Sequence, residues 1–250
     1  MVKIVVLGSS CLVATETRRP THLACLGADR GLLIDCGVSP RGRLEHLGFD
    51  PDRIGDVFIT HYHPDHAAGL PLFLMELSLR GRRAPMRLHG GGATVRRIRK
   101  AMLMYGWRKL PDSFPVSYRP VKRGKNAAVL ENAEFAVRST PVRHVVPTLA
   151  VRVDVRAAGK SFVYSADTEP CAELAELARD ADLLIHEATG EGPGHSSAAQ
   201  AGAVAKDARA GRLLLIHTDP YADADELAAQ AGAVFAGEVA VAADNLEIRW

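Results

Sequence analysis

The chain has 250 residues, 47% of them hydrophobic and 24% charged, with a formal net charge of +2. This balance is typical of a globular α/β protein, and we expect one domain over residues 1–250. No apolar run reaches the ~20 residues that span a bilayer, and the N-terminus lacks the long apolar core of a signal peptide, which argues against a membrane or secreted protein. The four scattered cysteines include no CxxC pair, so the cytoplasm is the simplest location.

Apolar runs typical of strands alternate with helical patterns along the first half of the chain. We expect strands at residues 2–7, 23–26, 32–36, 57–60 and 86–89 and helices at residues 41–47, 70–79 and 93–105. A stretch broken by prolines follows at residues 111–120, where we expect irregular structure.

The second half continues the alternation of strands and helices. We expect strands at residues 127–130, 135–139, 150–155, 162–165, 183–186, 213–216, 239–241 and 247–249 and helices at residues 171–178, 196–208 and 223–235. Two β-rich halves, each followed by helices, predict an α/β fold with four layers, an αββα sandwich in which helices lie outside two packed sheets.

The charges are distributed unevenly. Residues 80–125 contain fourteen Lys or Arg and a single acid, Asp112, which gives +13, whereas the other residues contain 17 basic and 28 acidic side chains, or −11. A segment this basic favours anionic partners. Two interpretations stay open: the segment contacts the substrate, or it is a solvated helix face without a functional role.

The most informative segment is Thr60-His61-Tyr62-His63-Pro64-Asp65-His66, directly after the expected strand at 57–59. Four potential metal ligands fall within six residues at the end of a strand. Imidazole suits zinc and neighbouring transition metals, and a carboxylate can complete such a site. His61 and His63 share one face of an extended segment, whereas Asp65 and His66 follow the turn at Pro64. The segment therefore predicts ligands for two neighbouring ions.

Three further candidates lie far along the chain. Asp167 and His217 follow the carboxyl ends of apolar strands, where α/β proteins place functional groups, and the two oxygens of Asp167 could contact two ions. His144 lies in a Val-rich segment and, taken alone, could equally be a core histidine. The remaining histidines of interest match no motif, and we interpret them as ordinary residues: His22, His46 and His89.

The HxHxDH segment resembles the signature of the metallo-β-lactamase superfamily. Gly8-Ser9-Ser10 is similar to its opening glycine turn, and Asp35-Cys36-Gly37 is similar to the motif that braces its metal loop. The resemblance implies that His144, Asp167 and His217 match the remaining metal motifs. It also implies one ion held by His61, His63 and His144, a second held by Asp65, His66 and His217, and Asp167 as the bridge.

Within the superfamily, the chain resembles the ribonuclease Z branch. Residues 183–189, which end in His-Glu-Ala-Thr, and residues 194–201 are similar to two segments of that branch. The resemblance implies that His195, which follows a flexible Gly192-Pro193-Gly194 segment, assists the leaving group, and that Asp65 is both a ligand and a proton acceptor. Glu187 could take part as well, but we favour a structural role for this acid.

The chain also departs from ribonuclease Z. That branch carries a long arm for tRNA between its third and fourth metal motifs, whereas His144 and Asp167 are only 23 residues apart here. The final motif, residues 217–221, lacks the arginine that reads phosphate in tRNA processors. These differences argue against tRNA maturation and leave the metal chemistry intact, as in compact, armless relatives that cleave cyclic or small phosphodiesters.

The expected function is therefore phosphodiester hydrolysis by two divalent ions, with zinc as the first choice and manganese or iron as alternatives. The substrate is expected to be anionic and to contain phosphate, with nucleic acid as one option, and relatives suggest a homodimer. The alternative is a carbonyl or sulfate ester hydrolase, acting on a lactone, thioester or arylsulfate at the same metal site.

Overall fold

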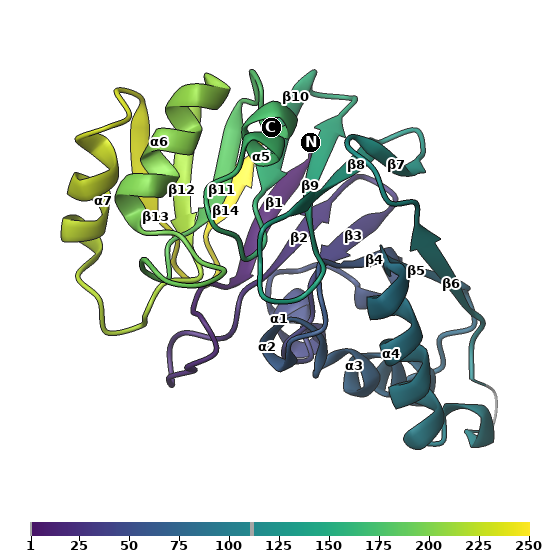
Figure 1. Cartoon of the computed structure of the whole chain (residues 1–250). Helices are drawn as coiled ribbons and strands as arrows, with labels where there is room; N and C mark the ends of the chain where they lie inside the picture. Colours follow the sequence, from purple (N-terminus) through teal and green to yellow (C-terminus); the bar gives the residue numbers. More distant parts are fainter. Residues whose placement is uncertain (1, 111–112) are drawn as a thin grey trace.

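Two mixed sheets form from the apolar runs of the chain (Figure 1). The computed structural model describes residues 2–110 and 113–250. The first sheet has the order β14 (Glu247–Arg249), β1 (Lys3–Gly8), β2 (His22–Leu26), β3 (Gly31–Ile34), β4 (Ile54–Ile59), β5 (Met86–Gly91) and β6 (Val116–Val121). The second has the order β13 (Glu238–Val241), β12 (Arg212–Ile216), β11 (Leu183–Glu187), β10 (Lys160–Tyr164), β9 (Thr148–Val155), β8 (Phe135–Val142) and β7 (Ala127–Glu131).

Helices cover the outer face of each sheet. The first sheet is covered by α1 (Arg41–His46), α2 (Pro64–Ala67), α3 (Leu70–Leu79) and α4 (Gly92–Met104), and the second by α5 (Ala172–Leu177), α6 (Ala198–Ala208) and α7 (Ala224–Gly232). Two short 3-10 turns, η1 (Pro51–Arg53) and η2 (Trp107–Lys109), complete the elements. Figure 1 shows α1 to α4 together on one side, while the N- and C-termini lie close together on the paired strands β1 and β14. The predicted four-layer αββα sandwich is confirmed.

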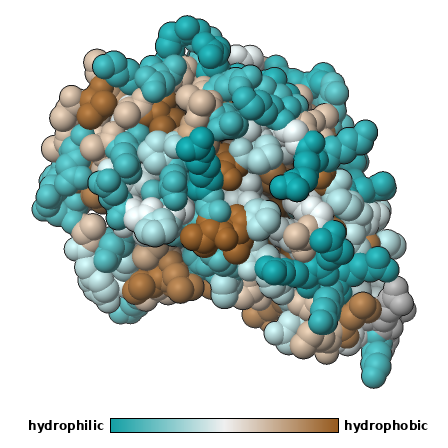
Figure 2. All heavy atoms as spheres, viewed as in Figure 1, coloured by the Kyte–Doolittle hydropathy of each residue, from teal (hydrophilic) through white to brown (hydrophobic). Residues whose placement is uncertain are grey.

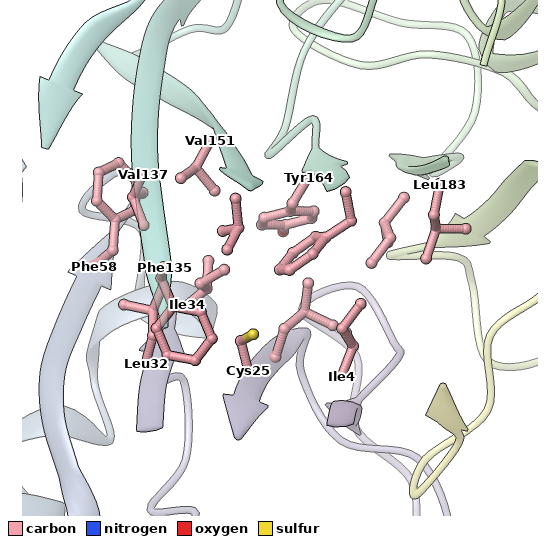
Figure 3. Packing of buried hydrophobic residues seen from close by; sticks show 14 of the residues in the cluster. Ile4, Cys25, Leu32, Ile34, Phe58, Phe135, Val137, Val151, Tyr164 and Leu183 are labelled. Atoms are coloured by element: carbon pink, nitrogen blue, oxygen red, sulfur yellow. The ribbon is translucent and has the colours of Figure 1, made fainter. Parts of the chain in front are cut away.

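Alternation along the strands explains why both faces of each sheet are apolar. In β1, Ile4 and Val6 point into the core between the sheets, and Val5 points toward the helices of the first layer. In β10, Phe162 belongs to the core between the sheets and Val163 to the helix-facing core. Successive side chains of a strand point to opposite faces, so strands buried on both faces have near-continuous apolar sequences. Figure 3 shows side chains of both sheets meeting in the central core.

One sequence expectation is wrong. Residues 111–120 were expected to be irregular because of their prolines, but β6 begins at Val116 and pairs in parallel with β5. Pro120 is tolerated because β6 is the edge strand of its sheet, where a missing backbone N–H need not break a ladder. The first two residues of that expected stretch, Pro111 and Asp112, lie outside the described residues.

Two simple properties follow from the described ranges. Cys11, Cys25, Cys36 and Cys171 all lie within them as free thiols. Among residues 2–110 and 113–250, the helices are too short or too polar to cross a membrane.

Candidate metal centre

The candidate ligands gather at the carboxyl ends of strands from both sheets. His61 lies two residues after β4, Asp167 three residues after β10, and His217 directly after β12. These strands run parallel to a neighbour in their own sheets, so their carboxyl ends share an edge with the neighbouring strand. His144, two residues after β8, completes the set from the second sheet. The fold therefore brings together side chains that are up to 156 residues apart in the sequence, from His61 to His217.

Four ligand atoms form a first cluster, made by His61, His63, His144 and Asp167. His63 Nδ1 lies 3.0 Å from His61 Nε2 and 3.2 Å from His144 Nε2. Asp167 Oδ2 lies 3.7 Å from His61 Nε2 and 3.9 Å from His144 Nε2. Bonds of 2.0–2.1 Å to a tetrahedral zinc ion place ligands about 3.3 Å apart, so these separations suit one ion.

A second cluster is made by Asp65, His66, His217 and again Asp167. His217 Nε2 lies 3.2 Å from Asp65 Oδ2 and 3.3 Å from His66 Nε2. Asp167 Oδ2 lies 3.4 Å from His66 Nε2, and its Oδ1 lies 3.6 Å from His217 Nε2. The carboxylate of Asp167 therefore faces both clusters.

Asp167 supplies a direct test of whether this donor set suits metal ions. Its Oδ1 is buried and, among the described residues, has no hydrogen-bonding partner. A buried carboxylate oxygen is costly without a donor or a cation. The oxygen lies beside the imidazole nitrogen of His217, a preferred ligand of zinc and its neighbours. The residues present therefore fit two divalent ions that share Asp167.

Hydrogen bonds on the far side of the rings orient three of the histidines. His144 Nδ1 donates to the carbonyl of Gly194 at 2.7 Å, so its Nε2 is left without a proton and faces the cluster. His66 Nδ1 lies 2.8 Å from Asp35 Oδ2, and His217 Nδ1 lies 2.8 Å from the hydroxyl of Thr189. Such outer partners fix the tautomer and orientation of metal-binding imidazoles.

Asp35 and Gly37 brace the metal loop, as the resemblance predicted. Asp35 Oδ1 accepts a hydrogen bond from the backbone N–H of Thr60 at 2.8 Å. A Cβ atom on Gly37 would lie 1.8 Å from the backbone oxygen of Asp65, so this close approach requires glycine. The backbone N–H of Cys36 donates to the carbonyl of His66 at 2.7 Å.

The pKa shifts reflect burial of the site and the buried carboxylates that favour nearby positive charge. Burial lowers the pKa of His61 well below its usual value, and the neighbouring His66 acts in the same direction. Burial alone would raise the pKa of Asp167, but His217 and His66 outweigh it and hold the pKa well below the usual range. Burial opposes a charge on His66, yet Asp167 and Asp35 raise its pKa well above its usual value. Bound cations would meet the same demand of these carboxylates.

His195 lies above both clusters without joining either. Its ring centroid is 5.0 Å from that of His144 and 6.1 Å from that of His217. Its Nδ1 lies 3.0 Å from Glu187 Oε1, and this hydrogen bond raises the pKa of His195. Its side chain is 27% exposed, so it can reach a bound substrate. Glu187, His195 and His217 also form a third group close enough to hold an ion.

Glu187 has the structural role that we favoured and also orients His195. It is fully buried and accepts hydrogen bonds from the backbone N–H groups of Thr168, Thr189 and Ser196. Hydrogen bonds hold Gly194, the last residue of the segment that we expected to be flexible. Gly194 N–H donates to Glu169 Oε1 at 2.8 Å, and its carbonyl is held by His144.

Two residues that support the clusters had no role in the sequence analysis. Gly194 takes a positive φ of 81°, and a Cβ there would lie 2.6 Å from His144 Nδ1. Its contact partner is 50 residues away, so no local pattern marks it. Thr189 ends the His-Glu-Ala-Thr segment, and this position was the one available signal. His22, His46 and His89 lie outside both clusters.

The basic residues of segment 80–125 fall into two groups, some exposed on α4 and others held in the fold. On α4, the guanidinium of Arg97 lies 5.7 Å from the ring centroid of Tyr62, between the ligand candidates His61 and His63. Hydrophilic side chains extend over the region of α4 in Figure 2. Arg87 instead pairs with Asp56 in the neighbouring strand, and Arg82 is buried. The segment therefore has a basic helix beside the candidate centre, while some of its charge stabilises the fold.

Comparisons with known proteins agree with this geometry. Ribonuclease Z of Methanothermobacter thermautotrophicus is 28% identical, over 87% of this chain and 86% of the relative. Ribonuclease Z of Myxococcus xanthus is 29% identical, over 99% of this chain and 97% of the relative.

Solved structures give the same result. The metallo-beta-lactamase fold protein YhfI from Bacillus subtilis superposes with a TM-score of 0.82 at 25% identity, over 99% of this chain and 98% of that chain. Human tRNase Z, short form, has a TM-score of 0.79 at 23% identity, over 99% and 98% of the two chains, and shares the fold. Residues 30–218 match the family described as the beta-lactamase superfamily domain. The chain therefore belongs to the beta-lactamase superfamily.

Proposed function

We propose that the protein is a dinuclear metal-dependent phosphodiesterase. The observation that carries the proposal is the pair of ligand clusters that share Asp167. His61, His63 and His144 would hold one ion, and Asp65, His66 and His217 the other. Zinc is the first choice because five of the seven ligands are imidazoles, and manganese and iron also accept this donor set.

The relatives support a phosphodiester as the scissile group. They carry the names ribonuclease Z and ribonuclease BN, and ribonucleases cleave phosphodiesters. This favours phosphodiester hydrolysis over the alternative of lactone, thioester or arylsulfate hydrolysis. The substrate is then an anionic, phosphate-containing molecule, with nucleic acid as one class. The four free thiols suit a reducing cytoplasm, and a homodimer is proposed by analogy alone.

The chain lacks the feature that the ribonuclease Z branch uses for tRNA. Between His144 and Asp167 lie only β9, a turn at residues 156–159 and β10. We therefore propose a small or cyclic phosphodiester, or a short single strand, in preference to a folded tRNA.

Bound divalent ions would supply Lewis acidity and activate water at neutral pH. Asp65, a member of the second cluster, would be both a ligand and the proton acceptor. Glu187 holds the Nδ1 side of His195, so the other ring nitrogen is free to donate a hydrogen bond or a proton to the departing oxygen. The raised pKa of His195 keeps this proton available near neutral pH.

A substrate panel tests the proposal. The purified protein, loaded with zinc or with manganese, is assayed on a phosphodiester, a lactone, a thioester and an arylsulfate. Of the four substrates, the phosphodiester is expected to be hydrolysed with the highest kcat/KM. A preference for any of the other three esters by tenfold or more would refute the proposed reaction while leaving the metal site untouched.

A further inference from the structure

A small pocket of about 160 Å³ opens between the metal loop and α4. Tyr62 and His63 of the loop line one side, and Ile98 and Ala101 of α4 line another. Tyr105, directly after α4, also lines it, together with Pro64, Ala67, Ala68 and Pro71 at α2 and the start of α3. His63 also belongs to the first ligand cluster, so the pocket lies beside the candidate metal centre.

Among residues 2–110 and 113–250, those that line the pocket are aromatic and apolar, with no acidic or basic side chain beyond the imidazole of His63. Tyr105 is 65% exposed and also lines the pocket. A pocket of about 160 Å³ has room for one planar ring system. Such a lining favours stacking of a flat aromatic group.

An arginine side chain lies beside Tyr62, one of the aromatic residues that line the pocket. The guanidinium of Arg97 lies 5.7 Å from the ring centroid of Tyr62, and Arg97 is exposed. Proteins that bind single-stranded nucleic acids combine aromatic rings for the bases with Arg or Lys for the phosphates. The same combination is present here at Tyr62, the residue before His63.

We propose that the pocket binds the nucleobase of a nucleotide whose phosphate lies at the metal centre. The base next to the scissile phosphate would then set specificity, with Tyr62 and Tyr105 as stacking surfaces. This inference rests on the proposed phosphodiesterase function, because it places the scissile phosphate at the two ligand clusters.

The test compares two ligands that share a ribose and a phosphate but differ in the base. Binding of adenosine monophosphate and of ribose 5-phosphate to the zinc-loaded protein is measured by calorimetry. We expect adenosine monophosphate to bind about tenfold more tightly. Tyr105→Ala removes a ring from the pocket, and Ala101→Leu fills it. Each should weaken the binding of adenosine monophosphate roughly fivefold or more and leave the affinity for ribose 5-phosphate unchanged.

Met104→Ala is the matched control. Met104 is 77% exposed, directly precedes Tyr105 and does not line the pocket, so its loss should leave both affinities unchanged. Melting temperature and zinc content confirm that each variant is folded and loaded. The proposal is overturned if the parent binds the two ligands equally, or if the variants weaken both ligands alike. It is also overturned if Tyr105→Ala separates a dimer in size-exclusion chromatography, because the pocket would then be an interface between copies.

Hydrolysis of bis(p-nitrophenyl) phosphate by the parent separates this proposal from the function on which it rests. A parent that hydrolyses this phosphodiester but does not prefer adenosine monophosphate lacks the base pocket and keeps the function. A parent that prefers adenosine monophosphate but hydrolyses no phosphodiester has the base pocket and not the proposed function.

Discussion

Residues outside both clusters determine how the side chains of the candidate site are oriented. The carbonyl of Gly194 fixes the tautomer of His144, and the carboxylate of Glu187 fixes the ring of His195. Glu187 is itself held by three backbone N–H groups, so it cannot turn away without breaking several hydrogen bonds. The geometry of the candidate site therefore depends on a set of buried hydrogen bonds around it.

His195→Ala is expected to lower kcat by roughly a hundredfold, as for the loss of a general acid. Metal content should not change, because the seven other candidate ligands remain. The loss should be smaller for a substrate with a nitrophenolate leaving group, which needs little protonation. Steady-state kinetics on a nitrophenyl ester and an alkyl ester, with metal analysis, check this. Equal losses on both esters would indicate positioning of the substrate, and loss of metal would make His195 a ligand.

Gly194→Ala is expected to weaken metal binding by roughly tenfold or more, as for other partners of metal-binding histidines. The new Cβ would lie 2.6 Å from His144 Nδ1, and the backbone φ of 81° is strained for alanine. Gly192→Ala in the same loop is the control, since its Cβ would meet no atom within 4 Å. Zinc affinity is measured by competition with a chelator. Equal affinities of the two variants would contradict the role of Gly194.

The two ends of strand β4 have different roles: its start is held by side chains of β5, and its carboxyl end leads to the candidate ligands. The carboxyl end of β4 leads into the metal loop, whereas Asp56 near its start binds Arg87 and His89 of β5. Arg87 is therefore a structural member of the basic segment, whereas α4 carries an exposed charge, Arg97, next to Tyr62 of the metal loop. A charge count over 80–125 could not separate these two roles.

Asp56→Asn is expected to lower the free energy of unfolding by about 2 kcal/mol at pH 7, because a buried charge partner of Arg87 is lost. Burial alone would raise the pKa of Asp56, but His89 and Arg87 outweigh it and lower the pKa. The stabilisation is thus complete above the usual Asp pKa of about 3.9 and is lost as the pH falls through the lowered value.

Urea denaturation of parent and variant, with a chelator present throughout, checks this at pH 7 and at pH 3. The difference between the two proteins should shrink at the acidic pH. A difference that stays constant would show that the Asp56 carboxylate is not the source of the stability.

The basic helix gives a prediction for substrate binding. Replacing Arg96, Arg97 and Arg99 of α4 with glutamine should raise KM for a dinucleotide and flatten the dependence of kcat/KM on salt concentration. The matched control replaces Arg119, Lys122 and Arg123, which lie on β6 and the following turn and carry the same charge. Kinetics at several salt concentrations compare the two. Identical behaviour of the two triple variants would show that the basic residues of α4 form a solvated face without a role in substrate binding.

At the scale of the whole molecule, much of the fold and the ligand set could be predicted from the sequence. Short continuous apolar runs predicted most strands, and the HxHxDH segment marks its ligands locally. Asp167 and His217 could be proposed because strand ends converge in α/β proteins. The expectation of irregular structure over residues 111–120 was wrong because β6 begins at Val116, and an edge strand tolerates proline. Gly194 could not be predicted, and Thr189 was marked only by the end of the His-Glu-Ala-Thr segment, since their partners are 50 and 28 residues away and become neighbours only in the fold.

Metal content tests the central claim, that two clusters sharing Asp167 hold two ions, most directly. Elemental analysis after gentle purification should give close to two metal equivalents per chain, and Asp167→Ala should lower the content of both ions because a bridging ligand is lost. A reproducible value of one equivalent or less in the parent, not restored by added zinc or manganese, would contradict the claim.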